Sequence, residues 1–215
     1  MESDLLGEIQ VPKDAYYGVQ TLRGLYNYNI TGVRLSSYRN FIKAFGMIKK
    51  ACIIANGRLG LIKKEIVDAV SQACDEVIEG KLDKEFVVDM IQGGAGTSTN
   101  MNANEVIANR ALEILGKEKG DYTTVSPNDH INKCQSTNDT YPSSGKLGMY
   151  LDHFELVAEL EKLIEAYKTV NPNAELELLT TDSTTGVSGA LDGTYTIGMA
   201  SRELKDSEVE GGAKA

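Results

Sequence analysis

Two polar segments of this sequence carry side chains suited to binding a small anion. In the first, residues 92–102, three glycines precede a run of hydroxyls and amides that begins at Thr97. Glycine lets a backbone approach a ligand closely, and a helix that follows offers unpaired N–H groups and a positive dipole end. This segment therefore suits a carboxylate or a phosphate. The same pattern is also typical of a plain glycine turn with a helix N-cap, in which Glu105 supports the first turn.

The second segment, residues 126–139, repeats this chemistry with hydroxyls, amides and a lysine. A loop that only connected two helices would be shorter and less rich in amides. Two such loops could hold a small dianion through neutral hydrogen bonds of roughly 1 kcal/mol each. The first segment has neither a dinucleotide-binding nor a P-loop pattern. His130 and His153 lack partners at metal-ligand spacing, and we expect both on the surface or in loops.

Composition and charge argue against a nucleic-acid-binding, membrane or secreted protein. The chain has 215 residues, a formal net charge of −9 and a pI near 4.8, which argues against nucleic acid or an anionic membrane as the main partner. The polar N-terminus shows no secretion signal, and no stretch is long and apolar enough to span a bilayer. The cysteines, at positions 52, 74 and 134, favour reduced thiols. We therefore expect a cytoplasmic protein without a metal or other cofactor.

Apolar periodicity predicts a mainly helical first part. Residues 1–37 are expected to form extended segments and turns, and Pro142 is expected to begin a later helix after a polar loop. Other helices are predicted over residues 37–60, 61–80, 84–91, 104–116 and 154–172.

The last part of the chain has a different pattern. Residues 151–215 carry 13 acidic and 5 basic side chains, a net charge of −8, against −1 for the first 150 residues. Leu176 and Leu178 alternate with polar residues as in a strand. A hydroxyl-rich turn, a short helix, a turn at Gly193 and a second short strand follow. This order predicts a small α/β segment.

Three stretches of the first part resemble the N-terminal region of aspartate ammonia-lyases, within the aspartase/fumarase superfamily. They are LLGEIQVPKDAYYGVQTLR, QGGAGTSTNMNANEVIANRALEILG and SPNDHINKCQSTNDTYP, and the similarity covers about residues 3–155. The forms GGAGTS and NKCQSTND look more like aspartase than like fumarase. The resemblance implies a mainly α lyase domain that converts L-aspartate to fumarate and ammonia.

The resemblance also implies which residues bind substrate. Thr97 would contact it from the first segment, and Ser136, Thr137 and Asn138 would bind its carboxylate and amino groups from the second. Family members are homotetramers that build each active site from three subunits. In fumarases the loop at residues 126–129 forms an accessory anion site, but Ser126 replaces the histidine of that loop, so the site is not predicted here.

The family's catalytic base is a serine in a signature of the type GSSxMPxKxNP, which does not occur among these residues. A GRTxxQDA-type segment, another source of substrate contacts, does not occur either. No catalytic residue is therefore assigned. The expected class is a carbon–nitrogen lyase, and we expect this chain to be inactive on its own.

The segment from about residue 155 to 210 resembles the first lobe of phosphate-binding proteins of bacterial ABC importers. The resemblance implies phosphate contacts from Ser183, Thr184 and Thr185 before a helix N-terminus, and from Ser201 and Arg202. These residue types suit phosphate binding, because a helix N-terminus and the guanidinium group of an arginine both bind oxyanions. The alternative is an ordinary turn and a surface arginine.

These observations predict three parts: a lyase-like domain over 1–140, a long helix over 141–170 and an α/β fragment over 171–215. The two resemblances meet near residues 150–157, without the Pro-, Gly- or Ser-rich composition of a natural linker. The chain is thus interpreted as a junction of two partial genes. Alternatives to the lyase function are a small-anion binding protein and a non-functional chimera.

Overall fold

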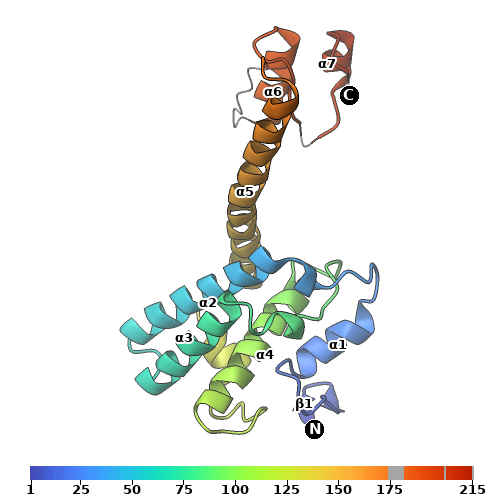
Figure 1. Ribbon diagram of the computed structural model, residues 1–215. Helices are drawn as coiled ribbons and strands as arrows, with labels where there is room; N and C mark the ends of the chain where they lie inside the picture. The colour runs from blue at the N-terminus through green and yellow to red at the C-terminus, as the bar shows by residue number, and fades with distance from the viewer. Residues whose placement is uncertain (174–181, 201, 215) are drawn as a thin grey trace. The chain divides into compact units, whose positions relative to one another are not determined.

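The computed structural model describes residues 1–173, 182–200 and 202–214, and most of them are helical (Figure 1). The chain divides into two compact units, Met1–Leu156 and Val157–Ala215. No helix among the described residues is both long enough and apolar enough to cross a membrane. The mainly α character predicted for the first part is confirmed.

The first unit begins with an antiparallel hairpin of β1 (Glu2–Asp4) and β2 (Gly7–Ile9), in which Glu2 pairs with Ile9. Its regular elements after the hairpin are α1 (Val19–Asn27), the 3-10 turn η1 (Leu35–Ser37), α2 (Arg39–Arg58), α3 (Lys64–Ile78), the 3-10 turn η2 (Asp83–Glu85), α4 (Thr97–Ile114), the π-helical turn η3 (Pro127–Ile131) and the start of α5 (Thr137–Val170). The second unit contains the rest of α5, α6 (Ser183–Leu191) and α7 (Asp206–Glu210).

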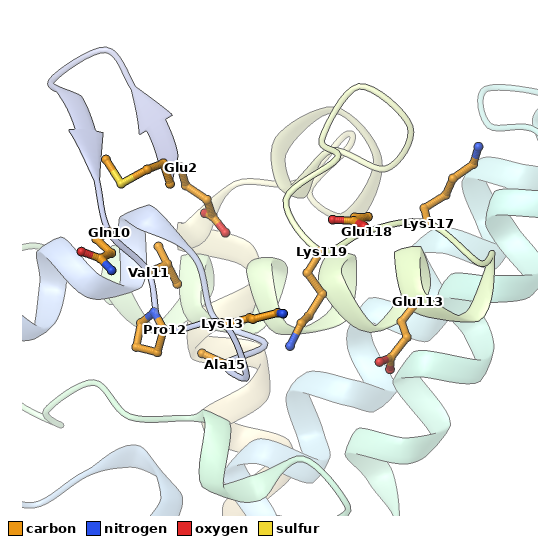
Figure 2. A pocket seen from close by; sticks show the side chains of 11 residues that line it. Glu2, Gln10, Val11, Pro12, Lys13, Ala15, Glu113, Lys117, Glu118 and Lys119 are labelled. Carbon is orange, nitrogen blue, oxygen red and sulfur yellow. The ribbon is translucent and has the colours of Figure 1, made fainter.

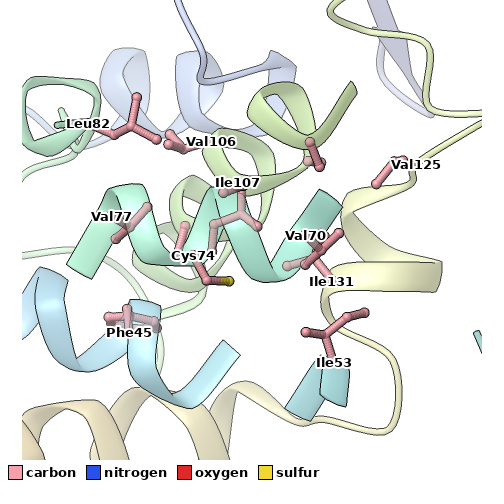
Figure 3. Packing of buried hydrophobic residues seen from close by; sticks show 14 of the residues in the cluster. Phe45, Ile53, Val70, Cys74, Val77, Leu82, Val106, Ile107, Val125 and Ile131 are labelled. Carbon is pink, nitrogen blue, oxygen red and sulfur yellow. The ribbon is translucent and has the colours of Figure 1, made fainter. Parts of the chain in front are cut away.

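The core of the first unit lies between α2, α3 and α4 (Figure 3). Phe45 of α2, Cys74 of α3 and Ile107 of α4 are all fully buried. Burial of each large apolar side chain contributes roughly 1.5–3 kcal/mol. A β-carbon on Gly46 would lie 2.9 Å from the side chain of Ile78, so glycine is what lets α2 and α3 approach this closely.

Helix α1 was not predicted from the sequence, which suggested only extended segments and turns before residue 37. Its N-terminus has no side-chain cap of its own, because the capping position is Gly18. The carboxylate of Glu105 on α4 takes that role and accepts hydrogen bonds from the backbone N–H groups of Gly18, Gln20 and Thr21 at 2.8–3.0 Å. A local sequence pattern does not reveal a cap supplied from a distant helix.

The helix predicted over residues 84–91 is wrong. After η2 the chain runs extended beside residues 33–36, and the N–H groups of Leu35 and Ser36 donate to the carbonyls of Val88 and Phe86, each at 2.9 Å. Arg34 and Asp89 form an antiparallel bridge. The β-branched pair Val87 and Val88 favours this extended backbone, and the apolar spacing that suggested a helix reflects burial on both sides.

Two helices begin earlier than predicted, α4 at Thr97 instead of residue 104 and α5 at Thr137 instead of Pro142. Side chains that close the first turns account for both differences. Pro142 lies inside α5 and lacks the N–H that would donate to the carbonyl of Asn138. At its other end, α5 stops at Val170, directly before the Asn171–Pro172 pair expected to end it.

The second predicted strand of the tail, after Gly193, does not form: among the described residues 182–200 and 202–214 the regular elements are α6 and α7. The backbone of residues 198–199 instead packs against Gly186 of α6. A single extended segment gains no ladder hydrogen bonds without a neighbouring strand. The first predicted strand, around Leu176 and Leu178, lies outside the described residues.

Candidate carboxylate-binding site

The N-terminus of α4 is shaped by the glycine-rich loop that precedes it. Gly94 and Gly96 have φ angles of +74° and +86°, which favour glycine. The first turn is capped by Gln92, whose side-chain oxygen accepts from the backbone N–H of Thr99 at 3.0 Å and whose amide donates to Thr99 Oγ1 at 2.6 Å. The hydroxyl and the N–H of Thr99 are therefore hydrogen-bonded within the fold, whereas Thr97 is exposed.

The start of α5 is closed by a reciprocal pair of hydrogen bonds. Ser136 Oγ accepts from the N–H of Asn138 at 3.2 Å, and Asp139 Oδ2 accepts from the N–H of Ser136 at 3.1 Å. This arrangement matches a capping box with aspartate at its third helical position. Ser136 and Asn138 are exposed, and Thr137 is half-buried. The segment thus presents two polar side chains to solvent from a fixed helix start.

Asn100, buried one turn into α4, joins the two segments. Its amide nitrogen donates to Thr137 Oγ1 at 3.3 Å and to Asn132 Oδ1 at 3.0 Å, and its oxygen accepts from Thr140 Oγ1 at 3.0 Å. Thr97 and Thr137 therefore belong to two helix starts that are tied together by one side chain. The structure brings together the segments that the sequence predicted would act together.

Beneath these helix starts lies a buried amide network centred on Asn132. Its Oδ1 atom accepts from Lys49 Nζ at 3.0 Å and from Asn104 Nδ2 at 3.3 Å, in addition to Asn100. Lys49 Nζ also donates to Gln135 Oε1 at 2.9 Å. Within the pattern NKCQSTND, Asn132 and Gln135 thus anchor the loop, whereas Ser136 and Asn138 are exposed.

Two open cavities are found near the N-terminal hairpin. One, of about 800 Å³, is lined by Thr97 together with Ser126 and Asn128, so it adjoins the start of α4. The other, of about 750 Å³, has lysine and glutamate side chains on its walls and none of the predicted site residues (Figure 2). Lys13 and Lys119 both line this cavity. The first cavity therefore includes one of the residues predicted to bind substrate, Thr97, whereas Ser136, Thr137 and Asn138 do not line it.

His130 makes a hydrogen bond within the loop at residues 126–131. Its Nδ1 atom accepts from the backbone N–H of Ser126 at 2.9 Å, and burial lowers the pKa of its imidazole. Ser126 caps η3 by accepting from the N–H groups of Asn128 and Asp129 at 3.2 and 3.0 Å. This loop is closed by its own side chains.

The residues suggested by the second resemblance have partners within their own segment. Asp182 caps α6 by accepting from the N–H and the hydroxyl of Thr185 at 2.9 and 3.1 Å. Arg202 forms a two-pronged ion pair with Glu208, at 2.7 and 2.8 Å. A phosphate would have to displace these carboxylates. Thr184 is exposed and Ser183 is half-buried, and Ser201 lies outside the described residues.

Four residues that organise the site were not among those predicted to bind substrate: Lys49, Gln92, Asn100 and Asn132. Asn100 and Asn132 lie inside the quoted motifs, so their polar character was a usable signal. Lys49 occupies a position that looks like an ordinary solvent-facing lysine among the charged residues of α2. Only its contacts across the fold reveal its role.

Comparison with known proteins gives consistent matches. A family model described as Lyase matches residues 7–175, which extends beyond the limit near residue 155 inferred from the motifs. The aspartate ammonia-lyase of Pseudomonas aeruginosa is 52% identical over 167 residues, which cover 78% of this chain and 35% of that protein. The chain thus spans about a third of the length of the curated relatives it matches.

Solved structures show the same likeness. A crystal structure of fumarate lyase:delta crystallin from Brucella melitensis in native form matches with a TM-score of 0.76 and 48% identity, over 78% of this chain and 38% of that one. A class II fumarase from Schistosoma mansoni matches with a TM-score of 0.64 and 40% identity, over 68% of this chain and 31% of that one.

Proposed function

This chain belongs to the lyase family, and from that premise we propose that it supplies the carboxylate-binding part of an aspartate ammonia-lyase. The relatives that carry this name are about half identical to it over their matched regions. The proposed reaction is the reversible elimination of ammonia from L-aspartate to give fumarate. Its ligands would be small dicarboxylates, and no step needs a metal or other cofactor.

The chemistry of the exposed residues suits the demands of this reaction. Removal of the proton next to the β-carboxylate places a second negative charge on that carboxylate in an aci-carboxylate intermediate. Neutral donors that are fixed in advance stabilise such a developing charge without reorganising. Thr97, Ser136 and Asn138 are exposed donors of this kind on two helix starts.

The observation that carries the proposal is the link between those helix starts. Asn100 connects α4 to Thr137, so the substrate-binding residues suggested for the two loops are held by one rigid network. The neighbouring polar residues Thr99 and Thr140 are satisfied within the fold. Thr97, Ser136 and Asn138, three of the four residues that the family resemblance assigns to substrate, remain exposed.

No base is assigned in this sequence, and we propose that the chain binds dicarboxylates without turning them over. The base would come from a lyase chain that carries the serine signature, in a mixed tetramer whose active sites combine residues from several subunits. The location that goes with this proposal is the cytoplasm.

Calorimetric titration of the purified chain with fumarate and L-aspartate tests binding, and absorbance at 240 nm tests fumarate formation. We expect fumarate to bind and a Ser136→Ala variant to bind it at least several-fold more weakly. Fumarate formation above the Ser136→Ala background would show that a base exists in this chain. A folded chain that binds neither ligand would overturn the proposal.

A competing proposal is that residues 182–202 bind phosphate, supported by the hydroxyls at the start of α6 and by Arg202. Asp182 and Glu208 would have to release the Thr185 and Arg202 donors for this to occur. Titration with inorganic phosphate separates the two functions, because an Arg202→Gln variant should weaken phosphate binding and leave fumarate binding unchanged.

A further inference from the structure

Lys49 is a fully buried lysine whose hydrogen-bond partners among the described residues are neutral. Its side chain is 0% exposed, and its Nζ atom donates to the amide oxygens of Asn132 and Gln135. No ion pair joins it to any carboxylate in the part of the chain that the structure describes. An unpaired charge in the interior is costly. Packing alone therefore does not explain why a lysine occupies this buried position.

The contacts of Lys49 lead directly to the proposed binding site. Asn132 Oδ1 lies 3.0 Å from Lys49 Nζ and 3.0 Å from Asn100 Nδ2, which lies 3.3 Å from Thr137 Oγ1. These three consecutive distances place Thr137 Oγ1 within about 9 Å of the ammonium. Coulomb attraction over that distance stays strong in the protein interior, where the effective dielectric constant is roughly 20.

The groups around the amine leave its charge largely uncompensated. Cys52 on α2 and Cys74 on α3 face it, and burial raises the pKa of both thiols, so both are neutral near pH 7. The acidic and basic side chains close to these thiols are Asp139, at the start of α5, near Cys52, and the surface pair Lys50–Asp75 near Cys74. Lys133, adjacent to Asn132, adds positive charge to the loop.

Building on the proposed function, we propose that Lys49 is a positioning residue that serves as a buried counter-charge for the bound dicarboxylate. Its ammonium holds Asn132 and Gln135, and through Asn132 it orients Asn100 and Thr137. When the dianion binds above this network, the Nζ atom takes up a proton from solvent. Ligand affinity is thereby linked to the protonation of a residue that does not touch the ligand.

The titration range of this amine makes the linkage measurable near neutral pH. Burial lowers the pKa of Lys49 to about 7, against smaller opposing effects of Cys52 and Cys74. Above pH 7 the free protein therefore holds mostly neutral amine. A dianion favours the charged form and raises that pKa. Affinity should accordingly fall as pH rises, approaching a tenfold loss per pH unit above about 7.

The test is calorimetric titration of the full chain with fumarate at pH 8, in two buffers that differ in ionisation enthalpy. The inference predicts net uptake approaching about 0.9 proton for each fumarate bound. A Lys49→Met variant, which keeps an unbranched side chain one atom shorter and removes the charge, should take up almost no proton and bind roughly tenfold more weakly at pH 7. Lys50→Met is the matched control, because Lys50 pairs with Asp75 at 2.6 Å on the α2–α3 surface, and it should behave as the parent chain.

The outcomes separate this inference from the proposed function. Fumarate binding without proton uptake in the unaltered chain would overturn the role of Lys49 while leaving the dicarboxylate site in place. A folded chain with no fumarate binding would overturn both. The measurement on the unaltered chain decides the question even if Lys49→Met does not fold, because proton uptake is not expected from a lysine whose role is only structural.

Discussion

The aromatic ring of Tyr141 lies directly over the backbone of Gly96, where a β-carbon on residue 96 would come within 2.1 Å of the ring. Tyr141 belongs to the first turns of α5, and it packs edge-on against Phe41 of α2, with ring centroids 5.5 Å apart. The glycine-rich loop is therefore covered by the helix that begins at the second polar segment. Glycine at position 96 serves both a left-handed backbone and this close ring contact.

Replacing Gly96 by alanine should destabilise the first unit by more than about 2 kcal/mol, because the methyl group adds a clash with Tyr141 to the strain of a φ angle of +86°. Urea unfolding followed by circular dichroism measures this. Gly94→Ala is the matched control: its φ is +74°, but the nearest atom is 4.0 Å away, so only strain of about 1 kcal/mol applies. Equal losses for both variants would mean that the ring contact is unimportant.

Alanine substitutions of Asn100 and Asn138 should affect stability and fumarate binding differently. Asn100→Ala leaves buried partners on Asn132, Thr137 and Thr140 without its contacts, so we expect a loss of roughly 2–4 kcal/mol in unfolding free energy together with weaker fumarate binding. Asn138→Ala changes an exposed side chain and should shift stability by less than about 0.5 kcal/mol while still weakening binding.

Unfolding curves and fumarate titrations of the two variants, made side by side, provide the measurement. If Asn138→Ala bound fumarate as tightly as the parent chain, its exposed amide would not be a ligand contact. If Asn100→Ala kept full stability, the link between the two helix starts would be weaker than its geometry suggests.

The sequence predicted α2 and α3 well because their apolar residues recur with helical spacing over long stretches. It missed the starts of α1 and α4, whose capping side chains lie outside those helices. Gln92 caps a helix five residues ahead of it, and Glu105 caps α1 from another helix, so neither helix start shows a local signal. The extended segment at Val87 and Val88 was misassigned because its pairing with residues 33–36 is a tertiary feature.

The substrate-binding role of the residues selected by resemblance stays a prediction. Motif resemblance selected Thr97, Ser136, Thr137 and Asn138, and the structure shows their two segments joined. The sequence could not predict which of these polar residues are exposed. A hydroxyl or amide residue in the sequence has the same appearance whether its side chain faces solvent or is hydrogen-bonded within the fold. Thr97 and Thr99 are only two residues apart, yet Thr97 is exposed and Thr99 is hydrogen-bonded to Gln92.

Glu105→Gln should loosen α1 and the N-terminal hairpin. The buried carboxylate accepts three backbone N–H groups and the hydroxyl of Thr21, and both of its oxygens are used. Any orientation of a glutamine amide points an NH₂ group at one of these donors. We expect a loss of roughly 2–4 kcal/mol and faster hydrogen exchange at residues 18–21. Glu113→Gln, on the exposed side of the same helix, should leave that exchange unchanged.

Asp89 should make stability sensitive to acid. Burial alone would raise the pKa of its carboxyl group, but hydrogen bonds from Ile91, Thr31 and Gly32 outweigh it and lower the pKa to about 2. Its folded pKa lies below the ordinary value of 3.8, so the stabilisation is complete above about pH 4 and is lost as pH falls towards 2. The carboxylate fastens residues 30–32 to the segment that leads into the glycine-rich loop.

The check is the urea midpoint of the parent chain and of Asp89→Asn between pH 2 and 6. Both carboxylate oxygens accept backbone or hydroxyl donors, so asparagine cannot reproduce the contacts. The midpoints should differ most above about pH 4 and converge near pH 2. Asp68→Asn, on the exposed side of α3, is the control and should track the parent chain. A difference between Asp89→Asn and the parent that stayed constant over this range would show that the contribution of Asp89 does not depend on its charge.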